Sequence, residues 1–410
     1  MVPSQVQDHL LERLELAVAA LRCRPSAFVD SEALAREAGL EVSELELHVR
    51  EHFHRTVAEL LAEARVEKAR QLLLGTARSV ADVAEEAGFG SVPILEESLT
   101  RRLGLGSRGL RRLPEASSFE LALPDPFPLP WLLAYLGRDP GSMVDRVRGT
   151  TYEAGVWLAG VPVRLSLTLE PGRARVQLDS NGRLPEQAAA EAHLAVLRRL
   201  GLTGDPGALE GRAAQDPAVA RLVKARPGLR LPMTFSPYEA LLWVIVGQQV
   251  TLGFAFTLFR RLVEKAGRPA GDGLWAPPRP EGTAQLTVEE LARVQFSQRK
   301  AEYAIGLSQR IAVGELDLAG LGQGSFTRAE QTLLAERGLG PWSAGYLAMR
   351  ALGFADCVPV GDAGLVRALA RFFVLPARPD AAETRRLMSP FSPHRSLATF
   401  HLWQSLEDAP

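Results

Sequence analysis

The chain has 410 residues, of which 46% are hydrophobic and 23% charged, and its formal net charge at pH 7 is −1. This length predicts two or three folded domains, and no apolar run approaches the roughly 18 residues that a membrane-spanning helix needs. Two cysteines, Cys23 and Cys357, are too few for a disulfide framework, a four-thiolate zinc site or an iron–sulfur cluster. Because the N-terminus also lacks the apolar segment of a secretory signal, we expect a cytoplasmic protein without a membrane partner.

The N-terminal part, residues 1–113, is predicted to be helical, because apolar residues recur there at spacings of three and four. It contains a weak internal repeat. SEALAREAGLEVSELELHVREHF, which starts at Ser31, is similar to SVADVAEEAGFGSVPILEESLTRRLG, which starts at Ser79. Each copy is typical of a helix-turn-helix unit, with a short helix, a glycine-containing turn and a second helix whose N-cap would be Ser43 or Ser91.

A long helix predicted from Ala58 to Leu74 would join the two units. The stretches ARSVADVAEEAGFGS, EKARQLLL and RRLGLGSRGLRRL resemble the C-terminal DNA-binding domain of AraC-type regulators. Helices that enter a major groove usually present basic or amide side chains to DNA. The second helices here instead carry four acidic residues, Glu44, Glu46, Glu96 and Glu97, within a part that has 15 basic against 18 acidic side chains. Sequence-specific DNA binding and a scaffold that packs on its neighbour are equally compatible with this pattern.

The Pro- and Ser-rich stretch LPEASSFELALPDPFPLPWLL that follows is typical of a linker at a domain boundary. Between Ser142 and Asp179 a period of two predicts three strands, TTYEAGVWLAG, VPVRLSLTLEPG and RARVQLDSNG, followed by the helix PEQAAAEAHLAVLRRLG. This middle part is therefore predicted to be α+β with an antiparallel sheet, and the chain from about Asp216 to be helical again. The predicted domains are residues 1–114, 118–205 and 206–410, so the fold class is mainly α with an α+β middle domain.

The stretch LAERGLGPWSAGYLAMRALGFADCVPVGD, from Leu334 to Asp362, predicts two helices joined by a tight turn at Gly338, Leu339 and Gly340. The first helix would end at residues 332–336, and the second would cover 342–352. Such a turn presents backbone N–H groups and a helix N-terminus, which suit a DNA phosphate without Lys or Arg. Asp362 precedes the helical run AGLVRALARFF, so it is either a simple N-cap or an N-cap that also places a carboxylate beside the DNA-facing turn.

This stretch resembles the helix-hairpin-helix, Gly/Pro loop and Asp signature of the DNA glycosylase superfamily that includes endonuclease III. Members that form a Schiff base carry a Lys at the position where this chain has Trp342, so the resemblance implies a monofunctional glycosylase. From about Phe119 to the C-terminus the chain resembles AlkA-type 3-methyladenine DNA glycosylases more narrowly. That resemblance lies in PFPLPWLLAYL, ARPGLRLPMTFSPYEALLWVIVGQQVTLGFA, SQRKAEYAIGLSQRI and HRSLATFHLWQSLED.

The resemblance implies that Asp362 is the catalytic residue, whose carboxylate stabilises an oxocarbenium-like sugar after the nucleotide leaves the stack. A pocket for an electron-poor alkylated purine would be formed by Trp342, Tyr346, Trp403, Tyr135 and Gln248. DNA contacts would come from Gly338, Leu339, Gly340 and Gln249, with either Gln249 or Leu252 filling the gap left by the base. The backbone carbonyls of Leu334, Glu336 and Leu339 would bind a monovalent cation, Na⁺ or K⁺, and no other cofactor is expected.

The seven histidines show no metal-binding pattern, and His48, His52 and His54 are typical of a solvated helix face. We therefore expect a monomer that excises 3-methyladenine- or 7-methylguanine-type bases from duplex DNA in base excision repair. Two alternatives are an AraC-type regulator that senses alkylation damage without efficient excision, and a glycosylase for a deaminated or oxidised base.

Overall fold

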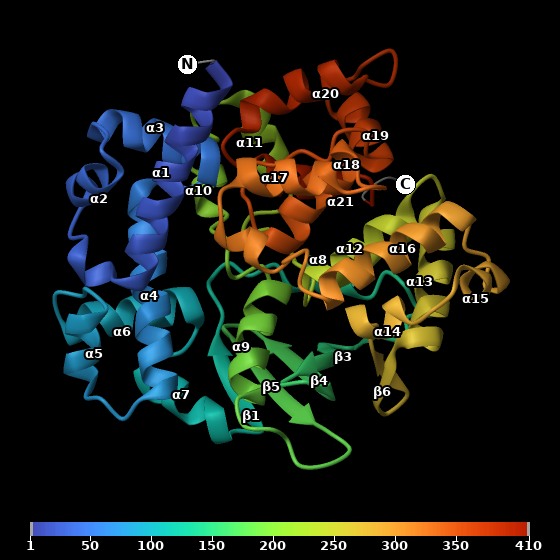
Figure 1. The fold of residues 1–410 in the computed structure, drawn as a ribbon, viewed down its shortest axis with the longest axis horizontal. Helices are drawn as coiled ribbons and strands as arrows, with labels where there is room; N and C mark the ends of the chain where they lie inside the picture. Colours follow the sequence, from blue (N-terminus) through green and yellow to red (C-terminus); the bar gives the residue numbers. More distant parts are fainter. Residues whose placement is uncertain (1–2, 408–410) are drawn as a thin grey trace.

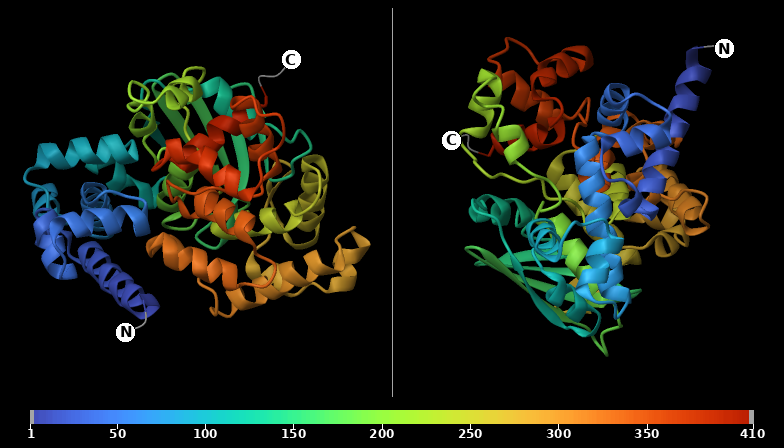
Figure 2. Two further views of the ribbon diagram at one scale, coloured as in Figure 1. Left: turned by 90° about the horizontal axis from the view of Figure 1, so that it is seen from above. Right: turned by 90° about the vertical axis from the view of Figure 1, so that its left-hand side faces the viewer.

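The computed structural model describes residues 3–407, which form three parts packed against one another (Figure 1). The N-terminal helices lie along one side, the sheet lies below, and the C-terminal helices cover the remaining side (Figures 1 and 2). None of the helices in residues 3–407 is both long and apolar enough to cross a membrane. The mainly α fold with an α+β middle part is as predicted.

The N-terminal part is a double helix-turn-helix, in which α2–α3 and α5–α6 are the two units and α4 joins them. Its helices are α1 (Pro3–Cys23), α2 (Ser31–Ala38), α3 (Val42–Phe53), α4 (Val57–Gly75), α5 (Val80–Glu86), α6 (Val92–Leu103) and α7 (Ser107–Arg112). Ser91 is the N-cap residue of α6 as predicted. The prediction of Ser43 as the N-cap of α3 is wrong, because the side chain of Glu44 accepts the Glu41 N–H at 3.1 Å and starts the helix earlier.

The middle part is a five-stranded antiparallel sheet in the order β1-β5-β4-β3-β2. Its strands are β1 (Ser118–Ala122), β2 (Asp145–Arg148), β3 (Thr151–Leu158), β4 (Val161–Glu170) and β5 (Arg173–Asp179), and its helices are α8 (Leu129–Leu136) and α9 (Ala188–Arg199). The interpretation of the Pro- and Ser-rich stretch as a linker is wrong. It supplies β1, which pairs with β5 at the sheet edge, and α8, whose prolines stand at the helix start, where no N–H is needed.

The C-terminal part is helical, with a short two-stranded hairpin added to the predicted helices. Its elements are α10 (Gly207–Glu210), α11 (Pro217–Val223), α12 (Pro237–Gly247), α13 (Leu252–Ala266), β6 (Arg268–Gly271), β7 (Leu274–Ala276), α14 (Pro280–Ala284), α15 (Val288–Arg293), α16 (Gln298–Ala312), α17 (Phe326–Ala335), α18 (Pro341–Leu347), α19 (Ala363–Phe372), α20 (Ala381–Met388) and α21 (Arg395–Gln404). The residues Ala348–Leu352 after α18 form one π-helical turn.

The two helix-turn-helix units are attached to the rest of the molecule in different ways. The second unit shares one continuous hydrophobic core with the sheet, in which Leu99 of α6 and Leu165 of β4 are both fully buried. The first unit has its own core and contacts α17 through the C-terminal end of α3. Because both ends of α4 are held in this way, the N-terminal part has a fixed orientation.

The contact of the first unit is centred on His54, which is only 7% exposed. Its ring packs on Phe326 and Phe354, with centroid separations of 4.2 Å and 5.9 Å, and its Nδ1 accepts the Asp356 N–H at 3.4 Å. The interpretation of this residue as part of a solvated face is therefore wrong. Burial of the imidazole lowers the pKa of His54 to about 4, so the ring is neutral at pH 7.

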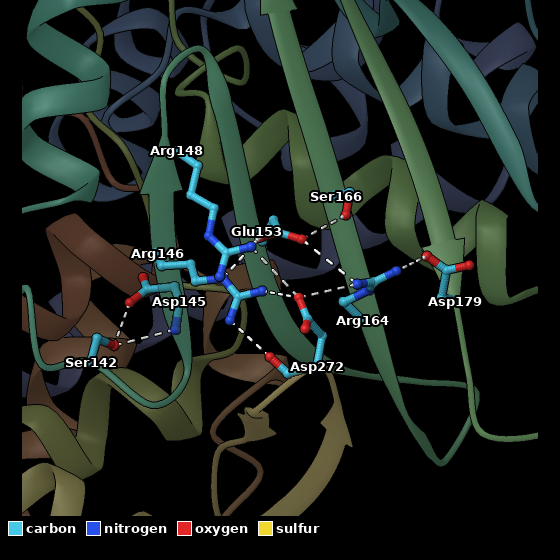
Figure 3. Close-up of polar contacts among 9 residues, drawn as sticks. All are labelled: Ser142, Asp145, Arg146, Arg148, Glu153, Arg164, Ser166, Asp179 and Asp272. Carbon is cyan, nitrogen blue, oxygen red and sulfur yellow. Dashed lines mark hydrogen bonds and ion pairs between the residues drawn. The ribbon is translucent and has the colours of Figure 1, made fainter.

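A charge network joins the sheet to the β6–β7 hairpin (Figure 3). Arg146 of β2 donates to Glu153 of β3 at 2.8 Å and also pairs with Asp272 of the hairpin. Arg164 of β4 lies 3.4 Å from the Asp272 carboxylate and 2.7 Å from Asp179. The network therefore connects four strands, β2 to β5, with a loop about a hundred residues further along the chain.

A second, buried pair connects the same sheet to α9. Arg199 donates to Asp145 at 2.6 Å and to the Tyr152 hydroxyl at 2.8 Å, and that hydroxyl donates to Asp145 at 3.0 Å. Arg199 is only 8% exposed. A buried guanidinium in this position requires its carboxylate partner, because a charge left without one is strongly destabilising.

We expect Asp145→Asn to lower the free energy of unfolding by about 3 kcal/mol, because it leaves the Arg199 charge buried without its carboxylate. Chemical denaturation followed by circular dichroism measures the change. Asp272→Asn is the matched control, since the Asp272 side chain is 46% exposed and its loss should leave the transition almost unchanged. Equal midpoints for Asp145→Asn and the unmodified chain would contradict the expectation.

Candidate active site

The hairpin between α17 and α18 is tight because glycine stands at its centre. Gly338 has a φ of +94°, and a Cβ at this position would lie 2.5 Å from the Tyr303 ring. Both the left-handed backbone and the lack of space require glycine here. The turn places Gly340 at the N-cap of α18, and Pro341 follows it, so the first N–H groups of that helix are those of Trp342 and Ser343, which have no partner within the helix.

A close approach of backbone to backbone brings Asp362 to the hairpin. A Cβ on Gly345 of α18 would lie 2.5 Å from the carbonyl oxygen of Val358, so the loop that leads to Asp362 packs directly on α18. Asp362 is the N-cap of α19, and its Oδ1 accepts the Leu365 N–H at 2.7 Å. Asp362 therefore caps α19 and also places its carboxylate beside the hairpin, which is the second of the two interpretations made from the sequence.

Two indole groups hold the Asp362 carboxylate from the pocket side. Trp342 Nε1 donates to Asp362 Oδ2 at 3.0 Å, and Trp403 Nε1 donates to Oδ1 at 2.9 Å. With the Leu365 N–H, three donors from three elements fix the orientation of this half-buried side chain. Hydrogen bonds of this kind hold the two carboxylate oxygens in one place.

The aromatic residues predicted for the base pocket surround this carboxylate. The Tyr346 ring lies 6.0 Å from Trp342 and 6.1 Å from Trp403, measured between ring centroids. Tyr135 of α8 is linked to the same group by Arg350, which donates to its hydroxyl and lies 5.8 Å from the Tyr346 centroid. The structure therefore gathers aromatic side chains from α8, α18 and α21.

Two arginines that the sequence analysis did not single out stand next to these tyrosines. Arg350 is 2% exposed, and the exposed Arg138 stacks on Tyr135 with its guanidinium carbon 4.1 Å from the ring centroid. Arg350 follows Tyr346 by four residues, so a helical face drawn from the sequence would have revealed it. No comparable pattern points to Arg138.

These charges change the acidity of the two tyrosines. Burial by itself would raise the pKa of Tyr135, but the Arg138 and Arg350 guanidiniums lower that pKa to about 8. For Tyr346 burial is the larger effect, and the pKa is raised. Tyr135 is therefore the more acidic member of the pair.

Tyr135 and Tyr346 also line a small cavity together with Arg138, Arg350 and Trp243. Its volume is about 70 Å³, well below the roughly 300 Å³ or more of a typical ligand pocket. The cavity therefore extends the aromatic group inward and is too small to hold a purine. Tyr346 is shared between this cavity and the two tryptophans that bind Asp362.

The segment between α12 and α13 lies against the hairpin. The Gln248 side-chain amide donates to the Gly338 carbonyl at 2.7 Å, which ties this segment to the turn. Gln249 is exposed with a φ of +54°, and Leu252 is 57% exposed. Both candidates for filling the gap in DNA are therefore at the surface, and a base contact by Gln248 stays a prediction.

The backbone fits the predicted cation site in one respect. α17 ends at Ala335, so the Leu334 carbonyl belongs to its last turn, where carbonyls have no partner further along the helix. Glu336 has an extended backbone, with φ −78° and ψ 129°, and its carbonyl accepts the Leu339 N–H at 3.1 Å. Cation binding by Leu334, Glu336 and Leu339 remains a prediction.

Two of the four acidic residues on the helix-turn-helix units have local partners. Glu44 bonds to the backbone at the start of α3, and Glu96 accepts the Ser107 N–H at 3.0 Å at the start of α7. They stabilise helix starts. Their presence is therefore no argument against DNA contact by the remaining helix surface.

Family models match three successive parts of the chain. A model described as a helix-turn-helix domain matches residues 34–113, and one described as the AlkA N-terminal domain matches residues 118–236. A model described as the HhH-GPD superfamily of base excision DNA repair proteins matches residues 242–393, which include the hairpin and Asp362.

Three curated relatives cover different shares of the chain. "DNA-3-methyladenine glycosylase" of Bacillus subtilis is 34% identical over 47% of this chain and 65% of its own length, slightly under two thirds. "DNA-3-methyladenine glycosylase 2" of Escherichia coli is 30% identical over 68% of this chain and 94% of its own length. "Probable bifunctional transcriptional activator/DNA repair enzyme AlkA" of Mycobacterium tuberculosis is 29% identical over 96% of this chain and 81% of its own length.

Among solved structures, a 3-methyladenine DNA glycosylase from Archaeoglobus fulgidus superimposes with a TM-score of 0.60 at 21% identity. The match covers 71% of this chain and 98% of that protein, and it shows that the two share a fold. The Escherichia coli relative is matched over almost its whole length, and the hairpin, the loop and the carboxylate stand together in the structure. The chain therefore belongs to the AlkA-type DNA glycosylases of the HhH-GPD base excision repair superfamily.

Proposed function

We propose that the chain is a monofunctional glycosylase that excises alkylated purines from duplex DNA and leaves an abasic site. The observation that carries the proposal is the Asp362 carboxylate, held by two indoles and one backbone N–H beside an aromatic group. Trp342 occupies the position where a Schiff-base lysine would stand, and an indole N–H is not a nucleophile. Water, rather than an enzyme amine, is therefore the proposed nucleophile.

In the proposed reaction the bond between C1′ and the base nitrogen breaks, and the base keeps the bonding electrons. A purine alkylated at N3 or N7 is cationic, so it leaves as a neutral molecule and needs no strong general acid. Positive charge then develops on the sugar, where Asp362 stabilises it electrostatically and orients the water that attacks C1′. The proton released by that water passes to the Asp362 carboxylate or to solvent.

Selection of the base would depend on the aromatic faces of Trp342, Tyr346, Trp403 and Tyr135. Each contact between an aromatic face and a cationic ring contributes about 0.5 to 2 kcal/mol, depending on desolvation. Arg350 opposes this, because its positive charge lies close to both tyrosines. Ionisation of Tyr135 would offset that charge, which gives the acidic phenol a role in accepting cationic bases.

The hairpin would bind the DNA backbone. The N–H groups at the start of α18, which have no partner within the helix, suit a phosphate oxygen, and Gln249 and Leu252 are exposed. We expect the carbonyls of Leu334, Glu336 and Leu339 to hold a monovalent cation, which would add positive charge next to that phosphate. This would allow a chain with a net charge of −1 to bind a polyanion locally.

The Asp362 arrangement favours excision over the alternative of a regulator that senses damage without excision. A protein that only binds a damaged base has no need for a carboxylate oriented by three donors. The second alternative, excision of a deaminated or oxidised base, differs in the product that is released. It is therefore tested by the chemical identity of the freed base.

We expect Asp362→Asn to reduce base release from methylated duplex DNA at least about 100-fold, because the amide lacks the charge that stabilises the sugar. Chromatography of the freed bases measures the rate and separates 3-methyladenine, 7-methylguanine and other products. Asn is also a good N-cap, so the start of α19 should be preserved. If the unmodified chain binds methylated DNA but releases no base, the protein is a damage-sensing binder or acts on another lesion.

Trp403→Phe should lower the single-turnover rate of base release about tenfold, because the ring is kept but a charge-assisted hydrogen bond to Asp362 is lost. Binding to DNA that contains an abasic site should change little. Trp157→Phe is the matched control, since its indole also donates a hydrogen bond, to the Pro277 carbonyl at 2.7 Å, in the sheet. A similar loss of rate in both variants would argue against positioning by Trp403.

One of the five tyrosines should titrate near pH 8, with phenolate absorbance appearing as the pH rises through that value. The step should be missing in Tyr135→Phe, because the two guanidiniums lower the pKa of Tyr135 specifically. It should persist in Tyr346→Phe, since burial raises the pKa of Tyr346. A step near pH 8 that survives Tyr135→Phe would assign the acidity to another residue.

A further inference from the structure

Two imidazoles and a carboxylate share one face of α3, away from Asp362. His48, Glu51 and His52 are spaced as i, i+3 and i+4, and one ligand atom from each lies within 4.8 Å of the others. His48 Nδ1 is 3.6 Å from Glu51 Oε2, and His52 Nε2 is 3.9 Å from the same oxygen. The two rings are nearly parallel, with centroids 5.8 Å apart.

These separations approach those required by a metal ion. Tetrahedral ligands at about 2.0–2.2 Å from zinc are about 3.3–3.6 Å from one another. The His48–Glu51 distance already falls in this range, and the His52–Glu51 distance exceeds it by a few tenths of an ångström. The Glu51 side chain is 62% exposed, so it can rotate to close the difference.

The ring nitrogens of the two histidines have different hydrogen-bonding surroundings. His48 Nδ1 is shielded from solvent and has no hydrogen-bond partner within the described part of the chain, a state that buried polar atoms rarely retain. His52 Nδ1 lies 2.9 Å from the Thr327 hydroxyl of α17. When Nδ1 donates to that hydroxyl, Nε2 carries the lone pair that faces Glu51, which is the usual way in which an outer partner orients a metal-bound histidine.

We propose that His48, Glu51 and His52 form a binding site for a divalent transition-metal ion of the zinc type. Two imidazole nitrogens and one carboxylate oxygen are ligands that suit such an ion, and water would complete the coordination at this partly exposed surface. The sequence predicted no metal site here, because these positions include no cysteine and form a possible ligand set only when i, i+3 and i+4 share one helix face.

The proposed metal site lies at the contact between α3 and α17. Thr327, which holds His52, belongs to α17, the helix that leads into the DNA-facing hairpin. A metal ion on His52 would fix the ring that joins α3 to α17. Metal binding would therefore strengthen the contact between the first helix-turn-helix unit and the glycosylase core.

The test is a titration of the full-length, tag-free chain with Co²⁺ and Zn²⁺, by visible absorbance for cobalt and calorimetry for zinc. We expect one equivalent to bind, and His48→Gln, His52→Gln and Glu51→Gln each to weaken the affinity at least tenfold. Glu51→Gln changes an exposed side chain, so its loss of affinity cannot be attributed to misfolding. Zinc should raise the melting temperature of the unmodified chain. It should raise that of the double variant His48→Gln/His52→Gln much less.

His9→Gln is the control, because His9 is exposed on α1 and outside the cluster. Thr327→Val tests the outer partner and should weaken the metal affinity about tenfold, while the three ligands remain. The proposal is overturned if neither ion binds, if the affinity survives Glu51→Gln and His52→Gln, or if His9→Gln lowers it equally. None of these outcomes depends on glycosylase activity.

Discussion

The active site depends on one carboxylate that is held from two directions. From the protein side, Asp362 caps α19 through the Leu365 N–H, and from the pocket side it accepts the Trp342 and Trp403 indoles. The cap fixes the backbone, and the indoles fix the plane of the carboxylate. In the proposed reaction, an orientation set before the substrate arrives would cost no reorganisation as positive charge develops on the sugar. The indole N–H groups bind the carboxylate, and the two rings pack against Tyr346.

Close contacts made possible by glycines hold the hairpin and the loop before Asp362 in place. Gly345 lets the loop before Asp362 lie directly on α18, and Gly338 lets the hairpin turn against Tyr303. Gln248 then ties the segment between α12 and α13 to the same turn. The surface that would contact DNA and the carboxylate that would act on the sugar are thus joined by direct contacts within one part of the fold.

The sequence predicted the hairpin and the carboxylate well, because they lie close together in the chain and depend on glycine, proline and aspartate at fixed spacings. Trp403 was predicted only through the family resemblance, because no local sequence pattern links it to Asp362, which lies 41 positions earlier. Features that depend on tertiary packing were missed, such as β1, a short edge strand between prolines, and the burial of His54 against Phe326. Arg138 was missed for a related reason, because the sequence does not show that this exposed arginine stacks on Tyr135.

The attachment of the helix-turn-helix units bears on what they can do. Had α4 been held at one end only, the N-terminal part could turn to meet DNA independently of the glycosylase core. Instead the second unit shares the core of the sheet, and the first is fixed to α17 around His54. Any duplex contacted by α6 would therefore stand at a fixed angle to the hairpin, and its distance from Asp362 would be set by the fold. Under this constraint, any DNA contact by the N-terminal part would influence which part of a duplex reaches the hairpin and Asp362.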